Sequence, residues 1–289
     1  MKTRIITSIV GLALLAVVLC FFNTVLFDLV IAAICLLAIH EAFQAFGFTL
    51  KQWYVYLPFV PFTLLLMLSQ SLSLASWLLP AAFLFVLYLC VCVIRFHRTL
   101  DAAKLGGLVF FSGVILLCFY SLIHLKRLLP VDQYSYDAVF FILLTLCFAW
   151  GGDSAAYFAG RFFGKHKLAP EVSPKKTIEG AIGGILGSVV LGIAAMAIYA
   201  PLSRNVEAFT ATNSSLTLYL VIAVMAMISS VLGILGDLFA SAVKRQVGIK
   251  DYGTIFPGHG GILDRFDSVM FIAPFVTIVV TVVFYHFQH

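Results

Sequence analysis

Long apolar runs restrict the fold of this chain more than any other feature of its sequence. Nine of them are close to the length of about 20 residues that an α-helix needs to cross the hydrocarbon core of a membrane. They cover residues 5–22, 25–40, 53–70, 77–94, 105–123, 136–152, 178–200, 216–240 and 268–286. The pattern predicts an all-α, polytopic transmembrane protein with about nine transmembrane helices.

The composition supports this prediction. Hydrophobic residues make up 62% of the 289 positions and charged residues only 11%, whereas a soluble domain carries roughly 25% charged residues. A surface built from this chain must therefore face lipid over most of its area. In such a protein a net charge of +5 indicates membrane orientation and contact with anionic lipid, and we expect no nucleic acid partner.

The distribution of basic residues predicts the orientation, because cytoplasmic loops carry an excess of Lys and Arg. If the N-terminus is cytoplasmic and nine helices span, 15 of the 18 basic residues lie inside, and only Lys126, Arg127 and Arg204 lie outside. The two long polar connections, 153–177 and 241–267, then both face the cytoplasm. The multi-pass protein is expected with its N-terminus inside and its C-terminus outside.

Polar chemistry is concentrated in the second half of the chain. Eight of the 13 acidic residues follow residue 150, and the glycines within 180–187 have the small-residue spacing that lets membrane helices pack closely. We therefore expect residues 1–135 to form helices of unassigned role, and residues 136–289 to form the catalytic region.

The end of the eighth run carries the first polar motif. Asp237, Ser241 and Lys244 recur at i, i+4 and i+7, so one face of a helix presents a carboxylate, a hydroxyl and an ammonium group. A charge at the centre of a membrane helix costs about 2.5–3.5 kcal/mol on insertion scales, and a bound cation or a water-filled cavity offsets that cost. The structural alternative is an interfacial ion pair between Asp237 and Lys244 or Arg245.

The loop that follows carries the second motif. Its Pro-Gly-His-Gly-Gly run, residues 257–261, permits positive φ and a close approach of the backbone to a ligand. Asp264 and Asp267 come next, where the ninth helix is expected to begin. Oxygen ligands of this kind suit Mg²⁺, which takes one or two carboxylates and shares substrate phosphates. A hydrogen bond within the turn is the structural alternative for His259.

A third motif precedes the seventh run. Ser173 followed by Pro174 predicts a helix that begins there, with the serine as its N-cap. The free N–H groups of that helix end, together with Lys175, Lys176 and Thr177, would form an anion site suited to a polyphosphate. Ordinary positive charge flanking a cytoplasmic helix end is the alternative.

A fourth motif leaves the sixth run. Asp153, Tyr157, Gly160 and Gly164 share one helical stripe, so an acid and a phenol line a surface that permits close packing. A structural ion pair between Asp153 and Arg161 is the alternative.

The stretch from Ser241 to Asp267 closely resembles the signature of phosphatidate cytidylyltransferases, also called CDP-diacylglycerol synthases. Residues 173–180 and 152–165 are similar to the same family, and the resemblance extends from about residue 150 to the C-terminus. It implies that CTP and phosphatidate are converted to CDP-diacylglycerol and pyrophosphate with Mg²⁺, and it leaves a second cation open. It also implies a bacterial inner membrane location, with the active site on the cytoplasmic side.

The motifs and the resemblance together assign roles to individual residues. Mg²⁺ is expected at Asp237 and Asp264, with Asp251 and Asp267 in support. Catalytic roles are expected for Asp237, Lys244, Arg245, Lys250, Asp251, His259, Asp264 and Arg265. Substrate contacts are expected from Asp153, Tyr157, Arg161, Ser173, Lys175, Lys176, Thr177, Ser241, Gly260 and Gly261.

Two other functions stay open at this point. A CTP-dependent kinase of polyprenol or another lipid alcohol would share the membrane setting and the nucleotide. A cation-coupled transporter would use Asp153 and Asp237 as intramembrane ion ligands. The sequence also leaves open whether the protein works as a homodimer.

Overall fold

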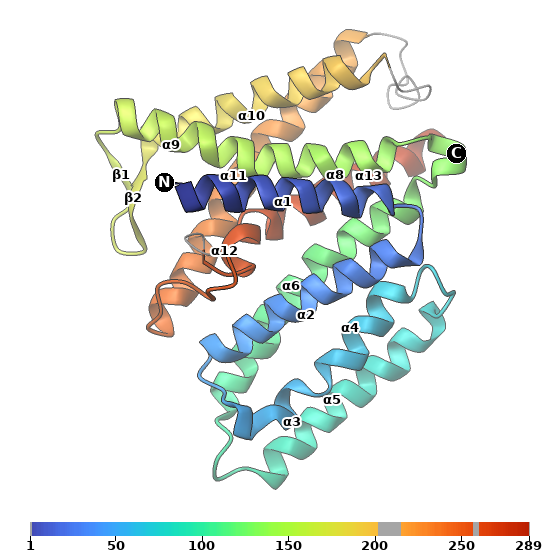
Figure 1. The fold of residues 1–289 in the computed structure, drawn as a ribbon, viewed down its shortest axis with the longest axis vertical. Coiled ribbons are helices and arrows are strands. Elements are labelled where there is room, and N and C mark those ends of the chain that lie inside the picture. The colour runs from blue at the N-terminus through green and yellow to red at the C-terminus, as the bar shows by residue number, and fades with distance from the viewer. Residues whose placement is uncertain (1, 202–214, 257–259, 289) are drawn as a thin grey trace. The chain divides into compact units, whose positions relative to one another are not determined.

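The computed structural model describes residues 2–201, 215–256 and 260–288, and it is mostly helical (Figure 1). The chain forms two compact units. The first contains Met1–Ile123 and Lys244–Phe266, and the second contains His124–Val243 and Asp267–His289. The chain passes from the first unit to the second within helix α6 (Ala102–Leu128), and it returns to the first unit within helix α11 (Ser215–Gln246).

The first unit is built from helices that bury large apolar side chains. Helix α2 packs against α4, and α4 packs against α5. Phe59 of α4 and Phe111 and Phe119 of α6 are almost completely buried, so aromatic packing forms its core. The elements are α1 (Lys2–Cys20), α2 (Val25–Ala45), η1 (Leu50–Gln52), α3 (Trp53–Tyr56), α4 (Phe59–Leu68), η2 (Ala75–Trp77), α5 (Leu78–Arg95), α6 (Ala102–Leu128) and α12 (Leu263–Phe266).

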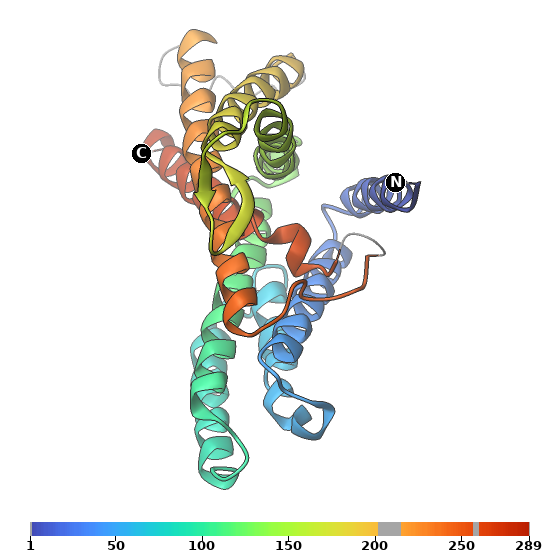
Figure 2. The same cartoon turned by 90° about the vertical axis from the view of Figure 1, so that its left-hand side faces the viewer.

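The second unit has α9 and α10 as its most closely packed pair, and Figures 1 and 2 show these two helices side by side. A Cβ at Gly183 would lie 2.1 Å from the Cβ of Ala159, and one at Gly187 would lie 2.2 Å from that of Ala155. The close packing predicted for the glycines of 180–187 is therefore confirmed. The elements are α7 (Val131–Tyr134), α8 (Asp137–Leu146), the π-helical turn η3 (Cys147–Gly151), α9 (Gly152–Phe163), β1 (Lys167–Ala169), β2 (Ser173–Thr177), α10 (Ile178–Tyr199), α11 (Ser215–Gln246) and α13 (Val269–Gln288).

A small antiparallel hairpin interrupts the helices between α9 and α10. Strands β1 and β2 pair with Lys167 opposite Thr177 and Ala169 opposite Ser173. The connection 153–177 is thus helical up to Phe163 and then forms this hairpin. The hairpin matters for the site because β2 carries Lys175 and Lys176.

Six helical segments of the described chain are long and apolar enough to cross a membrane. They are Val25–Ala45, Ala75–Arg95, Ala102–Leu128, Asp137–Phe163, Ile178–Tyr199 and Leu216–Gln246. Each corresponds to one of the nine predicted runs. The apolar stretches Ile9–Cys20 and Val269–Val282 are shorter. An α-helical, polytopic membrane protein is therefore confirmed, and the count of nine spans stays a prediction.

The run 53–70 does not form one continuous helix. It is divided into α3, which ends at Tyr56, and α4, which begins at Phe59 after Pro58. Proline lacks a backbone N–H and its ring clashes with the preceding turn, so it favours a break at this point. Helix α4 has 10 residues and is about 15 Å long, half the hydrocarbon thickness of roughly 30 Å.

Large apolar side chains also cover the outside of several helices. On α5, Leu79 is 80% exposed and Ile94 is 74% exposed. Contiguous apolar surface of this extent is avoided by soluble monomers, because it is unfavourable in water. It is the surface expected where a helix contacts lipid tails.

Candidate active site

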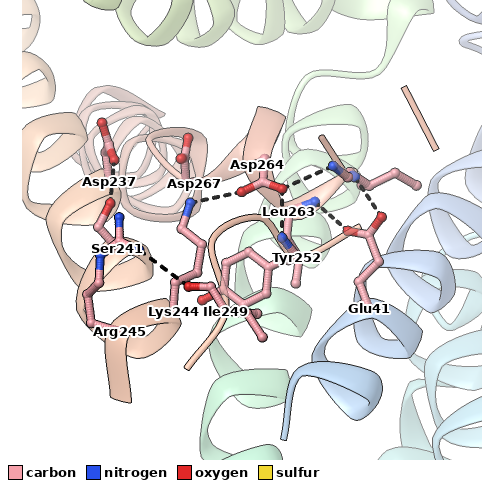
Figure 3. Close-up of polar contacts among 12 residues, drawn as sticks. Glu41, Asp237, Ser241, Lys244, Arg245, Ile249, Tyr252, Leu263, Asp264 and Asp267 are labelled. Atoms are coloured by element: carbon pink, nitrogen blue, oxygen red, sulfur yellow. Dashed lines mark hydrogen bonds and ion pairs between the residues drawn. The ribbon is translucent and has the colours of Figure 1, made fainter. Parts of the chain in front are cut away.

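Asp237 on α11 is the centre of a polar cluster in the second unit. Its Oδ2 forms an ion pair with the Lys176 Nζ at 2.6 Å. Its Oδ1 accepts a hydrogen bond from the Ser241 hydroxyl at 3.2 Å, which is drawn in Figure 3. The side chains of Lys176 and Asp237 are 22% and 24% exposed, so the pair is partly desolvated. The i, i+4 placement of Asp237 and Ser241 is as predicted. The lysine partner comes from β2, and not from the neighbouring turn of α11.

Asp267 and Asp153 lie in the same unit. A Cβ at Gly236 would be 2.5 Å from the carbonyl oxygen of Asp267. Because glycine has no side chain, α11 can pack directly against the backbone of Asp267. The Ser268 hydroxyl is buried and donates a hydrogen bond to the Asp153 Oδ2 at 3.0 Å. The structure thus connects α9, α11 and the start of α13 through polar groups that the sequence had placed in separate motifs.

The structure corrects the predicted start of the seventh helix. Ser173 is not an N-cap, because residues Ser173–Thr177 form strand β2 and α10 begins at Ile178. Thr177 is the N-cap, with extended backbone angles and a side chain that accepts a hydrogen bond from the Gly180 N–H at 3.1 Å. Proline suits an edge strand as well as a first helical turn, so the Ser-Pro pattern did not distinguish the two.

The strand places the two lysines differently. Side chains alternate along a strand, and Lys175 is exposed whereas Lys176 turns toward Asp237. Glu179, in the first turn of α10, accepts hydrogen bonds from the backbone N–H groups of Lys165 and His166 and contacts the His166 Nδ1 at 2.6 Å. These contacts fix the hairpin against the helix that follows it.

Asp264 is the centre of a second cluster, in the first unit (Figure 3). Its Oδ1 forms an ion pair with the Lys244 Nζ at 2.8 Å, and its Oδ2 accepts the backbone N–H of Tyr252 at 2.8 Å and of Gly261 at 3.0 Å. The side chains of Lys244 and Asp264 are only 10% and 5% exposed, and the Lys244 Nζ lies 5.3 Å from the centre of the Tyr252 ring. Lys244 therefore pairs with Asp264, which replaces the alternative pairing of Lys244 with Asp237.

The position of Asp264 differs from the prediction in one respect. It lies in the one-turn helix α12, and the ninth apolar run forms a separate helix, α13, that begins at Val269. The position of the Asp264 carboxylate is fixed by its three hydrogen-bond donors (Lys244 and the N–H groups of Tyr252 and Gly261) and not by the end of a long helix. Among its neighbours in the signature, Lys250, Asp251 and Arg265 are exposed, so Asp264 is the buried carboxylate of this loop.

The remaining predicted residues are less tightly placed. Arg161 donates a hydrogen bond to the Tyr157 hydroxyl at 3.2 Å, and Tyr157 is 60% exposed. Arg245 is exposed and donates to the Ile249 carbonyl at 3.4 Å. Gly260 has a φ of +85°, as the glycine-rich run had suggested. His259 lies outside the described residues.

Sequence reasoning missed one side chain of this region, Glu41 of α2. It is 3% exposed and accepts the backbone N–H groups of Ile262 and Leu263, both at 2.9 Å (Figure 3). A signal was present, since Glu41 is an ionisable residue next to a predicted span, where such residues are rare and usually functional. Glu41 is far in sequence from the polar motifs of the second half of the chain, so those motifs do not indicate it.

The donors of the Asp237 cluster are compatible with Mg²⁺. Among the described residues no group of three or more His, Cys, Asp or Glu side chains could hold a metal ion alone. Mg²⁺ does not need such a group, because it is usually bound by one or two carboxylates together with water and substrate phosphates. Asp237 offers a carboxylate and, through Ser241, a hydroxyl, and its carboxylate already faces the ammonium group of Lys176. The all-oxygen donor set fits a hard divalent cation.

The fold and these clusters define a polytopic helical membrane protein with paired acidic and basic side chains. The chain belongs to the cytidylyltransferase family, whose model matches residues 2–283.

Three relatives illustrate the similarity. A phosphatidate cytidylyltransferase of Bacillus subtilis (strain 168) is 37% identical over 192 residues, which cover 66% of this chain and 64% of that protein. Proteins of the same name from Staphylococcus saprophyticus and Staphylococcus aureus (strain COL) are 43% and 42% identical over 142 residues, about half of each chain. The chain thus matches between half and two thirds of the length of these relatives.

Proposed function

We propose that the chain transfers the cytidylyl group of CTP to phosphatidate and so produces CDP-diacylglycerol and pyrophosphate. The proposal is carried by the arrangement of the signature residues, in which Asp237 of α11 and Asp264 of α12 each form an ion pair with a lysine. Membership of the cytidylyltransferase family and the names of the relatives support it.

The reaction joins two anions, and this explains the type of residue in the site. A phosphate oxygen of phosphatidate forms a bond to the α-phosphorus of CTP. The bond from that phosphorus to the oxygen bridging it to the β-phosphate breaks, and pyrophosphate leaves with the electron pair. Transfer of this kind is catalysed mainly by positioning and charge stabilisation, so lysines and carboxylates are more useful here than a covalent nucleophile.

We assign the Mg²⁺ site to Asp237 and Asp264, with Asp251 and Asp267 in supporting roles. When bound, the metal would neutralise charge on the phosphate oxygens. Lys176 is paired with Asp237, so this side chain can hold the carboxylate before the substrates arrive and can exchange it for a phosphate group. Lys175 is exposed on the same strand, and we propose that the two lysines bind the β- and γ-phosphates of CTP.

We further propose nine spans, a cytoplasmic N-terminus and an active site on the cytoplasmic face of a bacterial inner membrane. This orientation would place 15 of the 18 basic residues on the inside, in agreement with the excess of Lys and Arg in cytoplasmic loops. A site at this surface can receive a soluble nucleotide from one side and a membrane lipid from the other.

The test is the reaction of the purified full chain in detergent with CTP, phosphatidate and Mg²⁺. The expected products are CDP-diacylglycerol and pyrophosphate in equal amounts. Release of CDP with phosphorylation of a lipid alcohol would instead identify a lipid kinase. A transporter would instead be identified if no labelled cytidine entered lipid and if vesicles that contain the protein took up a solute only when the coupling cation was present.

A further inference from the structure

Glu41 is a buried carboxylate that the proposed reaction does not use. It lies near the end of α2 and is 3% exposed. Its Oε1 accepts the N–H of Ile262 and its Oε2 accepts the N–H of Leu263, both at 2.9 Å. One carboxylate therefore binds two consecutive amides of a loop that follows it by more than 200 positions in the chain.

These two amides need a partner that the loop cannot provide. Helix α12 begins at Leu263, and the first N–H groups of a helix have no acceptor within the helix. A Ser, Thr, Asp or Asn at the preceding position often supplies one, but the residue there is Ile262, whose side chain has no acceptor. Glu41 supplies the missing acceptor from another helix (Figure 3).

Two glycines of the loop fit closely around the same carboxylate. A Cβ added to Gly253 or to Gly261 would lie 2.4 Å from the Glu41 Oε1, which is far closer than a carbon and an oxygen can approach. Neither glycine is among the residues of the described chain with positive φ. Their lack of a side chain is thus required by the approach of Glu41, and not by the backbone conformation.

The same turn holds Asp264. The N–H of Gly261 binds the Asp264 Oδ2 at 3.0 Å, and the next two amides bind Glu41. Three consecutive N–H groups are thus divided between the two carboxylates. If Glu41 no longer held Ile262 and Leu263, the turn could relax, and Asp264 would move with it.

We propose that Glu41 is a positioning residue, which caps α12 from α2 and so fixes the turn that carries Asp264. This assigns a role in the site to the N-terminal helices. The catalytic consequence rests on the proposed cytidylyltransferase function, whereas the consequence for the loop does not depend on it.

The first experiment compares Glu41→Gln with the wild type and with Asp28→Asn. Gln keeps the size of the side chain but presents an amide NH₂ to one of the two backbone N–H groups. Asp28 is a matched control, because it is a fully buried carboxylate on the same helix and accepts a hydrogen bond from Ser71. Glu41→Gln should lower kcat by about 10- to 100-fold, as expected for a lost hydrogen bond to a charged group, with the KM for CTP nearly unchanged. Asp28→Asn should leave kcat within a factor of about three, because Asp28 lies at the other end of α2, about 20 Å from Glu41.

The second experiment measures how often the loop opens, by its rate of proteolytic cleavage, and does not depend on activity. Lys250 is exposed, and tryptic cleavage after it should be faster in Glu41→Gln than in Asp28→Asn or the wild type, because a less stable loop opens more often. If the wild type makes no CDP-diacylglycerol, the proposed function fails while the cleavage comparison still tests Glu41. Cleavage at the wild-type rate in Glu41→Gln, or equal acceleration by Asp28→Asn, would overturn the proposal.

The third experiment tests the contact itself. When Glu41 is present, Gly261→Ala should strongly reduce the protection of the loop against tryptic cleavage, because the new methyl group overlaps the carboxylate. In a Glu41→Ala background that space is free, so adding Gly261→Ala should cause little further loss of loop protection. Residues in contact show such non-additivity, whereas independent residues do not. Equal losses from Gly261→Ala in both backgrounds would contradict the inference.

Discussion

Replacement of Lys244 by Met tests whether the ion pair with Asp264 is an essential part of the site. Methionine keeps most of the length of the side chain and its packing, but it removes the ammonium group. Asp264 would then remain as a carboxylate with a side chain that is 5% exposed. Among the residues that the structure describes, the N–H groups of Tyr252 and Gly261 would remain as its hydrogen-bond donors.

The size of the effect follows from this burial. Removing one partner of a buried ion pair costs about 3–5 kcal/mol, because an uncompensated charge is left in a poorly hydrated site. The two backbone donors that remain place the expected loss of unfolding free energy near the lower end, about 3 kcal/mol. A loss of that size corresponds to a decrease in Tm of about 6–12 °C for a chain of a few hundred residues.

The assay is the unfolding midpoint of the purified protein in one detergent, measured together with cytidylyl transfer. Lys51→Met is the control, because Lys51 is an exposed lysine of the same unit, and it should change stability by less than about 0.5 kcal/mol. The double variant Lys244→Met with Asp264→Asn should recover part of the lost stability, since neither partner is then charged. It should stay below about a thousandth of wild-type activity, because the carboxylate is gone.

Two results would refute this reasoning. A Lys244→Met protein that unfolds at the wild-type temperature would show that the buried pair contributes nothing to stability. A double variant whose loss equals the sum of the two single losses would show that the two side chains do not interact.

Three further predictions concern the proposed site and the topology. Asp237→Asn should lower activity by at least about 10³-fold, roughly 4 kcal/mol, in a protein that still folds; near-normal turnover with an unchanged Mg²⁺ dependence would make Asp237 structural. Lys175→Ala and Lys176→Ala should each raise the KM for CTP more than that for phosphatidate, and only Lys176→Ala should also alter the Mg²⁺ dependence, because only Lys176 holds Asp237. Equal effects on both substrates would count against phosphate binding. Cysteines introduced in 153–177 or 241–267 should resist an impermeant reagent applied from the periplasmic side, and labelling in intact cells would overturn the orientation.

Local sequence patterns were sufficient to predict much of the fold. Six of the predicted runs correspond to helices long enough to span, because burial of apolar side chains in lipid depends on composition over about 20 residues. The face shared by Asp237 and Ser241 followed from helical periodicity alone. The break at Pro58 and the strand Ser173–Thr177 did not follow, because the former depends on one residue within an apolar run and the latter on pairing with Lys167–Ala169.

The sequence by itself determined that this is a helical membrane protein, and it identified Asp237, Asp264 and the neighbouring lysines as candidate site residues, but not Glu41. Only the tertiary structure decided their partners. Asp237 is paired with Lys176, which is 61 positions earlier, and Asp264 is paired with Lys244. Glu41 binds amides of Ile262 and Leu263, which are more than 200 positions later. Backbone N–H groups occur at almost every residue, so no local pattern can reveal which of them a distant carboxylate will bind.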